Sequence, residues 1–376
     1  MKIAHFSDTH LGFTQFSAHN EAGLNQRESD VFGTFCDVLD SILEHEPDII
    51  LHTGDFFHRL RPSNHTLIAT FRKLMAVQRE RVAGAFIIVA GNHESPRSAG
   101  SGCILDLFDG EKGAGIPGVQ VVVSGTRKLN CGEVEIACVP SSSFGTNINV
   151  EPVAGKVSVL AAHGLDAQLS LGSKFSISEL ARSSEWAYIA LGDYHVHKEL
   201  MANAAYCGST DFTSTNIWEE AAVPKGWILF DSETGVHTFR EVSPRRRVLD
   251  LDPFDATDLS SAEIADRLHS AAQWPRDEKP IVRQRIFNVA PDARMGLDSD
   301  VVRDISLRAL YYYVDWKYAK KDVDGMPVPG AAGASLEDDW RNFASVRNIP
   351  SVIDRDEFTQ TGSSAIKEAA GVSAED

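Results

Sequence analysis

A chain of 376 residues is longer than one compact hydrophobic core usually organises, so we expect one larger and one smaller domain. Its 43% apolar and 24% charged residues are typical of a soluble globular protein, and neither a membrane-spanning run nor a signal-peptide pattern is present, which predicts a cytoplasmic protein with no membrane association. The formal net charge of −17 argues against a broad basic surface for nucleic acid, although acidic side chains that hold cations contribute to that total.

Five segments with the apolar pattern of a β-strand each end in polar residues. These segments are 2–7, 48–53, 85–90, 157–162 and 188–191, and they are followed by Asp8-Thr9-His10, Gly54-Asp55, Gly91-Asn92-His93-Glu94, His163-Gly164 and Gly192-Asp193-Tyr194-His195-Val196-His197. Between the early strands, apolar residues with a 3.6-residue period predict helices over about 31–43 and 67–75. Strand, helix, strand order predicts a largely parallel sheet, and further short strands make it mixed or double. Ligands gather at the carboxyl ends of such strands, where these motifs fall.

A change in composition at Arg245-Arg246-Arg247 predicts a domain boundary. Beyond it we expect a strand, a helix over about 260–273, a strand over 281–289, a helix over about 299–308 and a further element over 310–316. The predicted fold class is α/β, a layered sandwich of mixed β-sheets flanked by helices with a smaller C-terminal α/β domain. The predicted limits are 1–244 for the first domain, 245–345 for the second and 346–376 for a polar tail.

The residues at the strand ends form a ligand set of carboxylates, imidazoles and one amide. Its members are Asp8, His10, Asp55, Asn92, His163, His195 and His197. Mixed oxygen and nitrogen donors suit Mn²⁺, Fe or Zn²⁺, and seven ligands are too many for one tetrahedral ion. Two ions about 3.5–4 Å apart would share the set and leave positions for water and a phosphate oxygen. Each motif alone is better explained as a turn or a helix cap, so the prediction rests on their conjunction.

This order of motifs, D-x-H, G-D, G-N-H-E, H and then H-x-H, resembles the calcineurin-like metallophosphoesterase superfamily over about residues 1–240. The resemblance implies that Asp55 bridges two metal ions. It implies further that Asp8, His10 and His197 hold one ion and that Asn92, His163 and His195 hold the other. His93, beside the ligand Asn92, would contact the scissile phosphate and protonate the leaving oxygen; the alternative is a hydrogen bond within its loop.

The segment Gly54-Asp55-Phe56-Phe57-His58-Arg59-Leu60-Arg61-Pro62-Ser63 is similar to DNA double-strand-break repair nucleases of the SbcD type, relatives of the meiotic recombination eleven nuclease. That resemblance implies a Mn²⁺-dependent exo- and endonuclease, a homodimer formed through the helix near Thr66, an SMC-like ABC ATPase partner of the SbcC type, and a capping domain after residue 244. His58 would position phosphate or orient a ligand, or it is a polar loop residue. Four arginines are candidates for DNA contacts, namely Arg59, Arg61, Arg283 and Arg285, although acidic neighbours favour a solvated face.

One departure concerns the last motif, which the family writes G-H-x-H. Here Asp193 and Tyr194 stand between Gly192 and His195, so the loop is interpreted as two residues longer. Asp193 is a candidate additional ligand, but a place beside the ligands or in solvent is favoured because the nitrogen ligands are already supplied. The ions held by His195 and His197 stay open. Two other functions also stay open: a phosphoesterase acting on small molecules or nucleotides, and a structural subunit of an ATPase complex with a vestigial site.

Overall fold

The computed structural model describes residues 1–81, 84–95, 102–112, 115–144, 148, 150–169, 186–318, 336–346 and 354–369. The chain divides into two compact units, Met1–Lys317 and Tyr318–Asp376. Each helix among the described residues is too short or too polar to span a lipid bilayer.

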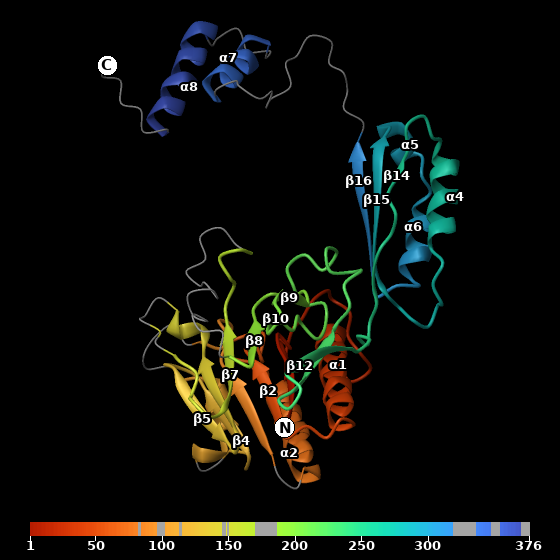
Figure 1. Cartoon of the computed structure of the whole chain (residues 1–376). Helices are drawn as coiled ribbons and strands as arrows, with labels where there is room; N and C mark the ends of the chain where they lie inside the picture. The colour runs from red at the N-terminus through yellow and green to blue at the C-terminus, as the bar shows by residue number, and fades with distance from the viewer. Residues whose placement is uncertain are drawn as a thin grey trace. The chain divides into compact units, whose positions relative to one another are not determined.

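The first of two six-stranded sheets has the strand order β12-β11-β1-β2-β3-β4 (Figure 1). Its strands are β1 (Lys2–Phe6), β2 (Ile49–Thr53), β3 (Ala85–Val89), β4 (Val119–Val122), β11 (Gly226–Asp231) and β12 (Val236–Glu241). Strands β1 to β4 are parallel, whereas β11 and β12 are antiparallel to their neighbours. The carboxyl ends of β1, β2 and β3 therefore lie at one edge of this sheet.

The second sheet has the order β5-β6-β7-β8-β10-β9. Its strands are β5 (Arg127–Cys131), β6 (Val134–Val139), β7 (Val157–His163), β8 (Tyr188–Gly192), β9 (Lys198–Met201) and β10 (Ala204–Tyr206). The four central strands are parallel, and an antiparallel strand closes each edge. Strands β2 and β3 contact β7 and β8 across the sandwich, so residues that follow β7 and β8 lie near those that follow β1, β2 and β3. The predicted layered sandwich of mixed sheets is confirmed.

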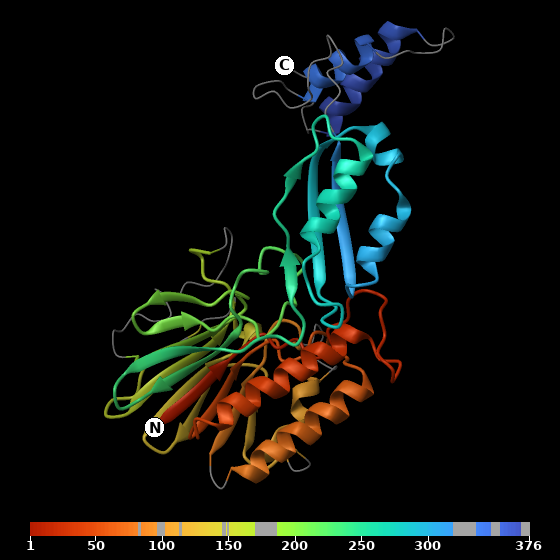
Figure 2. The same ribbon diagram turned by 90° about the vertical axis from the view of Figure 1, so that its right-hand side faces the viewer.

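Two helices, α1 (Gln26–Leu43) and α2 (Asn64–Glu80), lie side by side against the first sheet (Figure 2). The Asn25 side chain caps α1 by accepting from the backbone N–H groups of Arg27 and Glu28. The apolar stripe of α1 packs in the same hydrophobic core as β1 to β3, and only Phe32 and Leu43 of it are partly exposed. Most of the stripe of α2 also packs on this core, but the Ile68 side chain is 51% exposed. Short 3-10 turns lie at Ile104–Leu107, Gly110–Lys112 and Ser141–Ser143.

A third, smaller sheet follows residue 244 within the same unit. Its strands are β13 (Val248–Asp250), β14 (Phe254–Asp255), β15 (Ile281–Val289) and β16 (Tyr311–Tyr318), and its helices are α4 (Ser261–Ala271), α5 (Pro291–Met295) and α6 (Ser299–Ser306). Strands β13 and β14 both pair in parallel with β15, and β16 pairs with the other edge of β15. Helix α4 begins with a capping box formed by Ser260 and Glu263. The helices cover one face of this sheet (Figure 1).

The second unit contains helices α7 (Leu336–Val346) and α8 (Arg355–Ala369). The Trp340 indole N–H donates to the Thr359 carbonyl at 2.8 Å, and the Trp340 ring contacts that of Phe358. Helix α8 therefore lies in the segment expected to be a tail. The predicted limits at 244 and 345, and a capping domain separate from the first, stay predictions.

Candidate metal centre

The loops after β1 and β2 bring the first three predicted ligands together. The backbone N–H of Asp8 donates to the Gly54 carbonyl at 3.0 Å, and that of His10 donates to the Asp55 carbonyl at 2.9 Å. All three residues have a left-handed backbone conformation, with φ of 52° at Asp8, 46° at His10 and 53° at Asp55. Asp and His tolerate this conformation better than bulky residues do, and it turns each side chain away from the strand direction.

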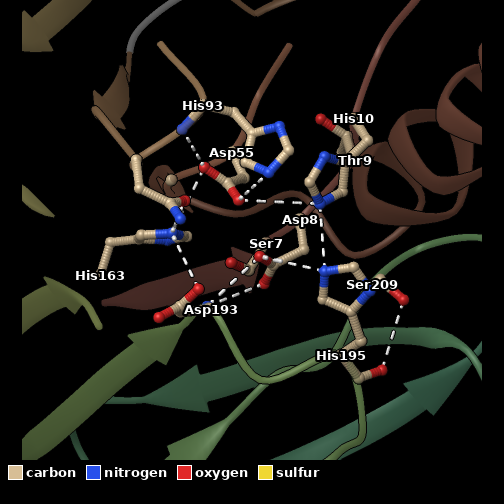
Figure 3. Close-up of polar contacts among 12 residues, drawn as sticks. Ser7, Asp8, Thr9, His10, Asp55, His93, His163, Asp193, His195 and Ser209 are labelled. Carbon is tan, nitrogen blue, oxygen red and sulfur yellow. Dashed lines mark hydrogen bonds and ion pairs between the residues drawn. The ribbon is translucent and has the colours of Figure 1, made fainter. Parts of the chain in front are cut away.

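Asp55 lies at the centre of the cluster (Figure 3). Its carboxylate is 3.7 Å from His10 Nε2, 3.4 Å from His163 Nε2 and 3.9 Å from His93 Nε2. The His93 backbone N–H donates to Asp55 Oδ1 at 3.0 Å. Burial acts to raise the Asp55 pKa, but the charge and hydrogen bond of His163 outweigh it and hold this pKa well below its usual range. Asp55 therefore stays ionised although only 2% of it is exposed.

On one side of Asp55, His10 and His195 face each other, with their Nε2 atoms 3.1 Å apart. Asp8 Oδ1 is 3.9 Å from His195 Nε2, and these three residues form one group that could hold a cation. Burial holds the pKa of His10 well below its usual value, so its imidazole is neutral and able to act as a ligand. Burial also raises the pKa of the Asp8 carboxyl, which has no exposed surface.

On the other side, His163 approaches three oxygen donors. Its Nε2 is 3.4 Å from Asn92 Oδ1, 3.4 Å from Asp55 Oδ1 and 3.7 Å from Asp193 Oδ1. The His163 Nδ1–H donates to the Thr53 carbonyl at 2.7 Å, which directs Nε2 at Asp55, and a cation bound there would take the place of the Nε2 proton. Asp8, Asp55 and His163 form a second group that could hold a cation.

The last motif differs from the sequence interpretation. His197 lies outside the cation groups found among the described residues: its Nδ1 bonds to the Tyr206 carbonyl at 3.0 Å, and its ring stacks on Phe239 with centroids 4.2 Å apart. Asp193, whose φ is 98°, turns back into the cluster, and its backbone N–H donates to the Asp8 carboxylate. The pair that enters the cluster is therefore Asp193 and His195, in place of His195 and His197.

His93 and His58 lie at the exposed side of Asp55. The His93 Nδ1–H donates to the His58 carbonyl at 2.7 Å, and 35% of the His93 side chain is exposed. His58 Nδ1 lies 3.4 Å from His10 Nδ1, and burial and the neighbouring His93 lower the His58 pKa to about 4. His10, His58 and His93 form a third group that could hold a cation, so ligation competes with a role in contacting substrate.

Two residues behind His195 give no signal in the sequence. Glu220 Oε1 is 3.6 Å from His195 Nδ1, and Lys225 donates both to Glu220 at 2.6 Å and to the His195 carbonyl at 3.1 Å. Glu220 and Lys225 are buried and come from an irregular segment without periodicity. Carboxylates behind a ligating imidazole orient its ring and raise its basicity.

Glu94, the last residue of the G-N-H-E motif, joins two of the loops. Its carboxylate accepts the backbone N–H of Phe57 at 2.5 Å and that of Gly91 at 3.0 Å. Burial, and then the Asp55 charge, raise the Glu94 pKa to about 8. Glu94 therefore supports the loops that carry Asp55 and Asn92 rather than facing the cluster's open side.

The candidate arginines are not collected at this cluster. Arg59 and Arg61 are exposed in the loop after β2, where Arg59 donates to the Thr14 hydroxyl. Arg283 and Arg285 lie on β15 and both bond to Asp250, at 2.8 Å and 3.0 Å.

Comparison with known proteins gives consistent relatives. The family model described as calcineurin-like phosphoesterase matches residues 1–199. The chain is 29% identical over 245 residues to the DNA double-strand break repair protein Mre11 of Methanocaldococcus jannaschii, covering 61% of this chain and 62% of that one. It is 30% identical over 275 residues to the Haloferax volcanii protein of the same name, covering 71% and 57%, and 24% identical over 291 residues to that of Thermoplasma acidophilum, covering 74% of each.

The chain spans about three fifths of the length of the first two relatives. The matched family region contains the elements β1 to β8 and all the residues of the two cation groups around Asp55. Because that region covers more than half of the 376 residues, the chain belongs to the calcineurin-like phosphoesterase family.

Proposed function

We propose that this protein is a two-metal phosphodiesterase that cleaves DNA in double-strand-break repair. The observation that carries the proposal is the convergence of carboxylates and imidazoles, most of them buried, on Asp55 from the ends of β1, β2, β7 and β8, with Asn92 and His93 added from the end of β3. The substrate class is taken from the similar proteins, whose names describe DNA double-strand break repair.

The ligand sets follow the geometry on each side of Asp55. One ion would be held by Asp8, His10, Asp55 and His195, and the other by Asp55, Asn92, His163 and Asp193. These donors fit divalent cations. Histidine Nε2 atoms lie 3.4–3.9 Å from the buried Asp8 and Asp55 carboxylates, so oxygen and nitrogen donors face each other at each position. Relative to the sets implied by the resemblance, His195 moves to the first set and the Asp193 carboxylate takes its place in the second, which makes the second set richer in oxygen and favours Mn²⁺ over softer ions. Such ions would lower the pKa of a bound water and neutralise charge on the phosphate.

His93 is proposed to contact the scissile phosphate and to protonate the leaving oxygen. Its Nδ1–H already donates to a carbonyl, so Nε2 carries a proton only in the charged imidazolium form. Donation of a proton to the leaving oxygen would therefore come from the Nε2–H of the imidazolium, and Nε2 lies 3.9 Å from the Asp55 carboxylate. His58, whose pKa is about 4, is neutral at pH 7 and is proposed to position His10 and His93 rather than to donate a proton.

The assembly is proposed from the family resemblance. We expect a homodimer that uses α2, where Ile68 offers the exposed apolar side chain, and an SMC-like ABC ATPase partner of the SbcC type. The third sheet is proposed as a capping domain, with limits at residues 244 and 345. Light scattering that shows a monomer at every concentration would remove the dimer from this proposal.

The first experiment compares hydrolysis of duplex DNA, single-stranded DNA and a nitrophenyl phosphodiester with Mn²⁺ and with EDTA. DNA cleavage that requires Mn²⁺ supports the proposal. Rapid hydrolysis of the nitrophenyl ester or of nucleotides with no DNA cleavage would favour a small-molecule phosphodiesterase instead. The net charge of −17 and the ion pairs that Arg283 and Arg285 form with Asp250 favour that second function.

The ligand sets are tested by metal content. Asp193→Ala should lose one of two bound Mn²⁺ ions per chain, because it removes a carboxylate next to His163. His197→Ala is the matched control, since His197 is bonded and stacked away from the cluster, and it should retain both ions. Loss of metal from His197→Ala alone would restore the original H-x-H assignment.

A further inference from the structure

The third sheet has one open face that the described helices do not cover. Tyr312, Val314 and Trp316 of β16 pack into the core beneath α4 and α6. Because side chains alternate along a strand, Tyr311, Tyr313 and Lys317 lie on the opposite face. On the neighbouring strand β15, buried Val282 and Ile286 belong to the same core, so Arg283, Arg285 and Phe287 share the open face with the two tyrosines.

The aromatic rings on this face are exposed and nearly parallel. Tyr311 is 38% and Tyr313 is 41% exposed. Their ring planes differ by 17° and their centroids are 6.5 Å apart, which is close to twice the ~3.4 Å step between stacked bases. The Phe16 ring stacks on Tyr311 at 4.0 Å with planes 16° apart, which fixes the orientation of the Tyr311 ring. Phe287, 39% exposed, adds a further aromatic side chain on β15.

Cations lie on the strand beside these rings. Arg283 and Arg285 follow one another on the open face of β15, and Lys317 lies further along β16. Asp250 and Asp315 bind these three side chains, so this face carries three cations against two carboxylates in a chain whose net charge is −17. The Arg283 guanidinium also lies 5.1 Å from the Trp218 ring centroid. Flat aromatic rings next to guanidinium groups suit a ligand in which flat, stackable groups alternate along the molecule with negatively charged groups.

We propose that the open face of the third sheet binds single-stranded DNA, with unpaired bases stacked on Tyr311 and Tyr313 and phosphates next to Arg283, Arg285 and Lys317. This rests on the proposed action on DNA and specifies which form of DNA the smaller domain holds. Every base has a flat face that stacks on an aromatic ring, so binding would not depend on sequence. The duplex hides those faces, and only an unpaired end or gap would use the tyrosines.

The experiment measures binding of the full chain to a fluorescently labelled 20-residue oligo-dT strand and to a blunt duplex, in EDTA so that no cleavage occurs. Tyr313→Ala should weaken oligo-dT binding about 5- to 150-fold, the range for loss of one base–aromatic stack. Tyr313→Phe, which keeps the ring, should bind like the unchanged protein. Tyr318→Ala is the matched control: Tyr318 is a 54% exposed tyrosine of the same strand whose side chain is on the other face. It should leave oligo-dT binding unchanged.

The outcomes separate this inference from the proposed function. Equal oligo-dT affinity in Tyr313→Ala, Tyr318→Ala and the unchanged protein, together with normal Mn²⁺-dependent DNA cleavage, overturns the single-strand site and leaves the nuclease intact. A protein that binds neither DNA form and cleaves neither, while hydrolysing the nitrophenyl ester, overturns both. If Tyr313→Ala weakens duplex binding and oligo-dT binding by the same factor, Tyr313 does not distinguish unpaired bases, and this result also overturns the site.

Discussion

Gly91 packs directly against Asp55, so we expect the geometry of the cluster to be sensitive to any side chain added at Gly91. A Cβ atom at Gly91 would lie 2.1 Å from Asp55 Oδ1 and 2.2 Å from the Asp55 backbone nitrogen, whereas real Cβ contacts essentially never fall below 3.0 Å. In Gly91→Ala the loops after β2 and β3 must therefore separate by about 1 Å, and a displacement of that size at a reacting centre can cost about 10²-fold in rate. We also expect a loss of about 1–3 kcal/mol in the free energy of unfolding from overpacking.

The matched control is Gly132→Ala, in the turn between β5 and β6. Gly132 has φ of 69° with no atom within 4 Å of an added Cβ, so this substitution costs about 1–2 kcal/mol of backbone strain without touching the cluster. Hydrolysis of a nitrophenyl phosphodiester, bound Mn²⁺ and urea unfolding are measured for both variants. A Gly91→Ala protein with full metal content and a rate within threefold of Gly132→Ala would refute this account of the site.

Four further substitutions test separate parts of the structure. Asp55→Ala should abolish hydrolysis and lower bound metal, because Asp55 lies between both ligand groups; normal metal content with a normal rate contradicts this. His93→Ala should keep its metal but lose about 10²–10⁴-fold in rate, and parallel loss of metal would make His93 a ligand. Glu220→Gln should weaken metal binding or activity about 10- to 100-fold, and an unchanged titration would show that His195 needs no support. Arg27→Met should cost about 3–5 kcal/mol in urea unfolding, because it leaves the buried Asp211 without its guanidinium partner; a smaller loss means that Thr34 and backbone N–H groups suffice.

Most of the residues that cluster around Asp55 could be predicted from the sequence because their positions follow from the topology. A residue that directly follows a parallel strand must lie at the carboxyl edge of its sheet, so Asp8, Asp55 and Asn92 needed only their strands to be recognised. His163 comes from the second sheet, and the contacts of β2 and β3 with β7 bring it to Asp55. The apolar residues that predict these strands are the same residues that are buried in the hydrophobic core.

The H-x-H interpretation of the last motif rested on an equally local assumption. Residues i and i+2 share a face only while the chain stays extended, and that assumption paired His195 with His197. Strand β8 ends at Gly192, and the left-handed backbone of Asp193 turns the chain before His195 is reached. Residues 193–197 form a bend between β8 and β9, so the alternation of an extended chain does not hold there, and the donors that point into the cluster are one carboxylate and one imidazole. The residue types at 193–197 do not place that turn by themselves, since Asp occurs both in solvated loops and at left-handed positions.

The open face of the third sheet is formed by segments that lie apart in the sequence. No segment of the sequence interleaves aromatic and basic residues in the manner of a single-strand track. In the fold, tyrosines on β16 and arginines on β15 interleave across the sheet rather than along the chain, because the two strands are paired side by side. Strand pairing joins segments that helices α5 and α6 separate in sequence, so the mixed surface exists only after the sheet has formed. The acidic net charge of the chain also gives no indication of this surface. Asp250 and Asp315 neutralise part of its basic charge, so the face is an aromatic surface with cations beside it rather than a broad basic patch. Binding through such a surface would depend on stacking more than on counterion release, so its affinity should fall less steeply with salt than that of a basic groove.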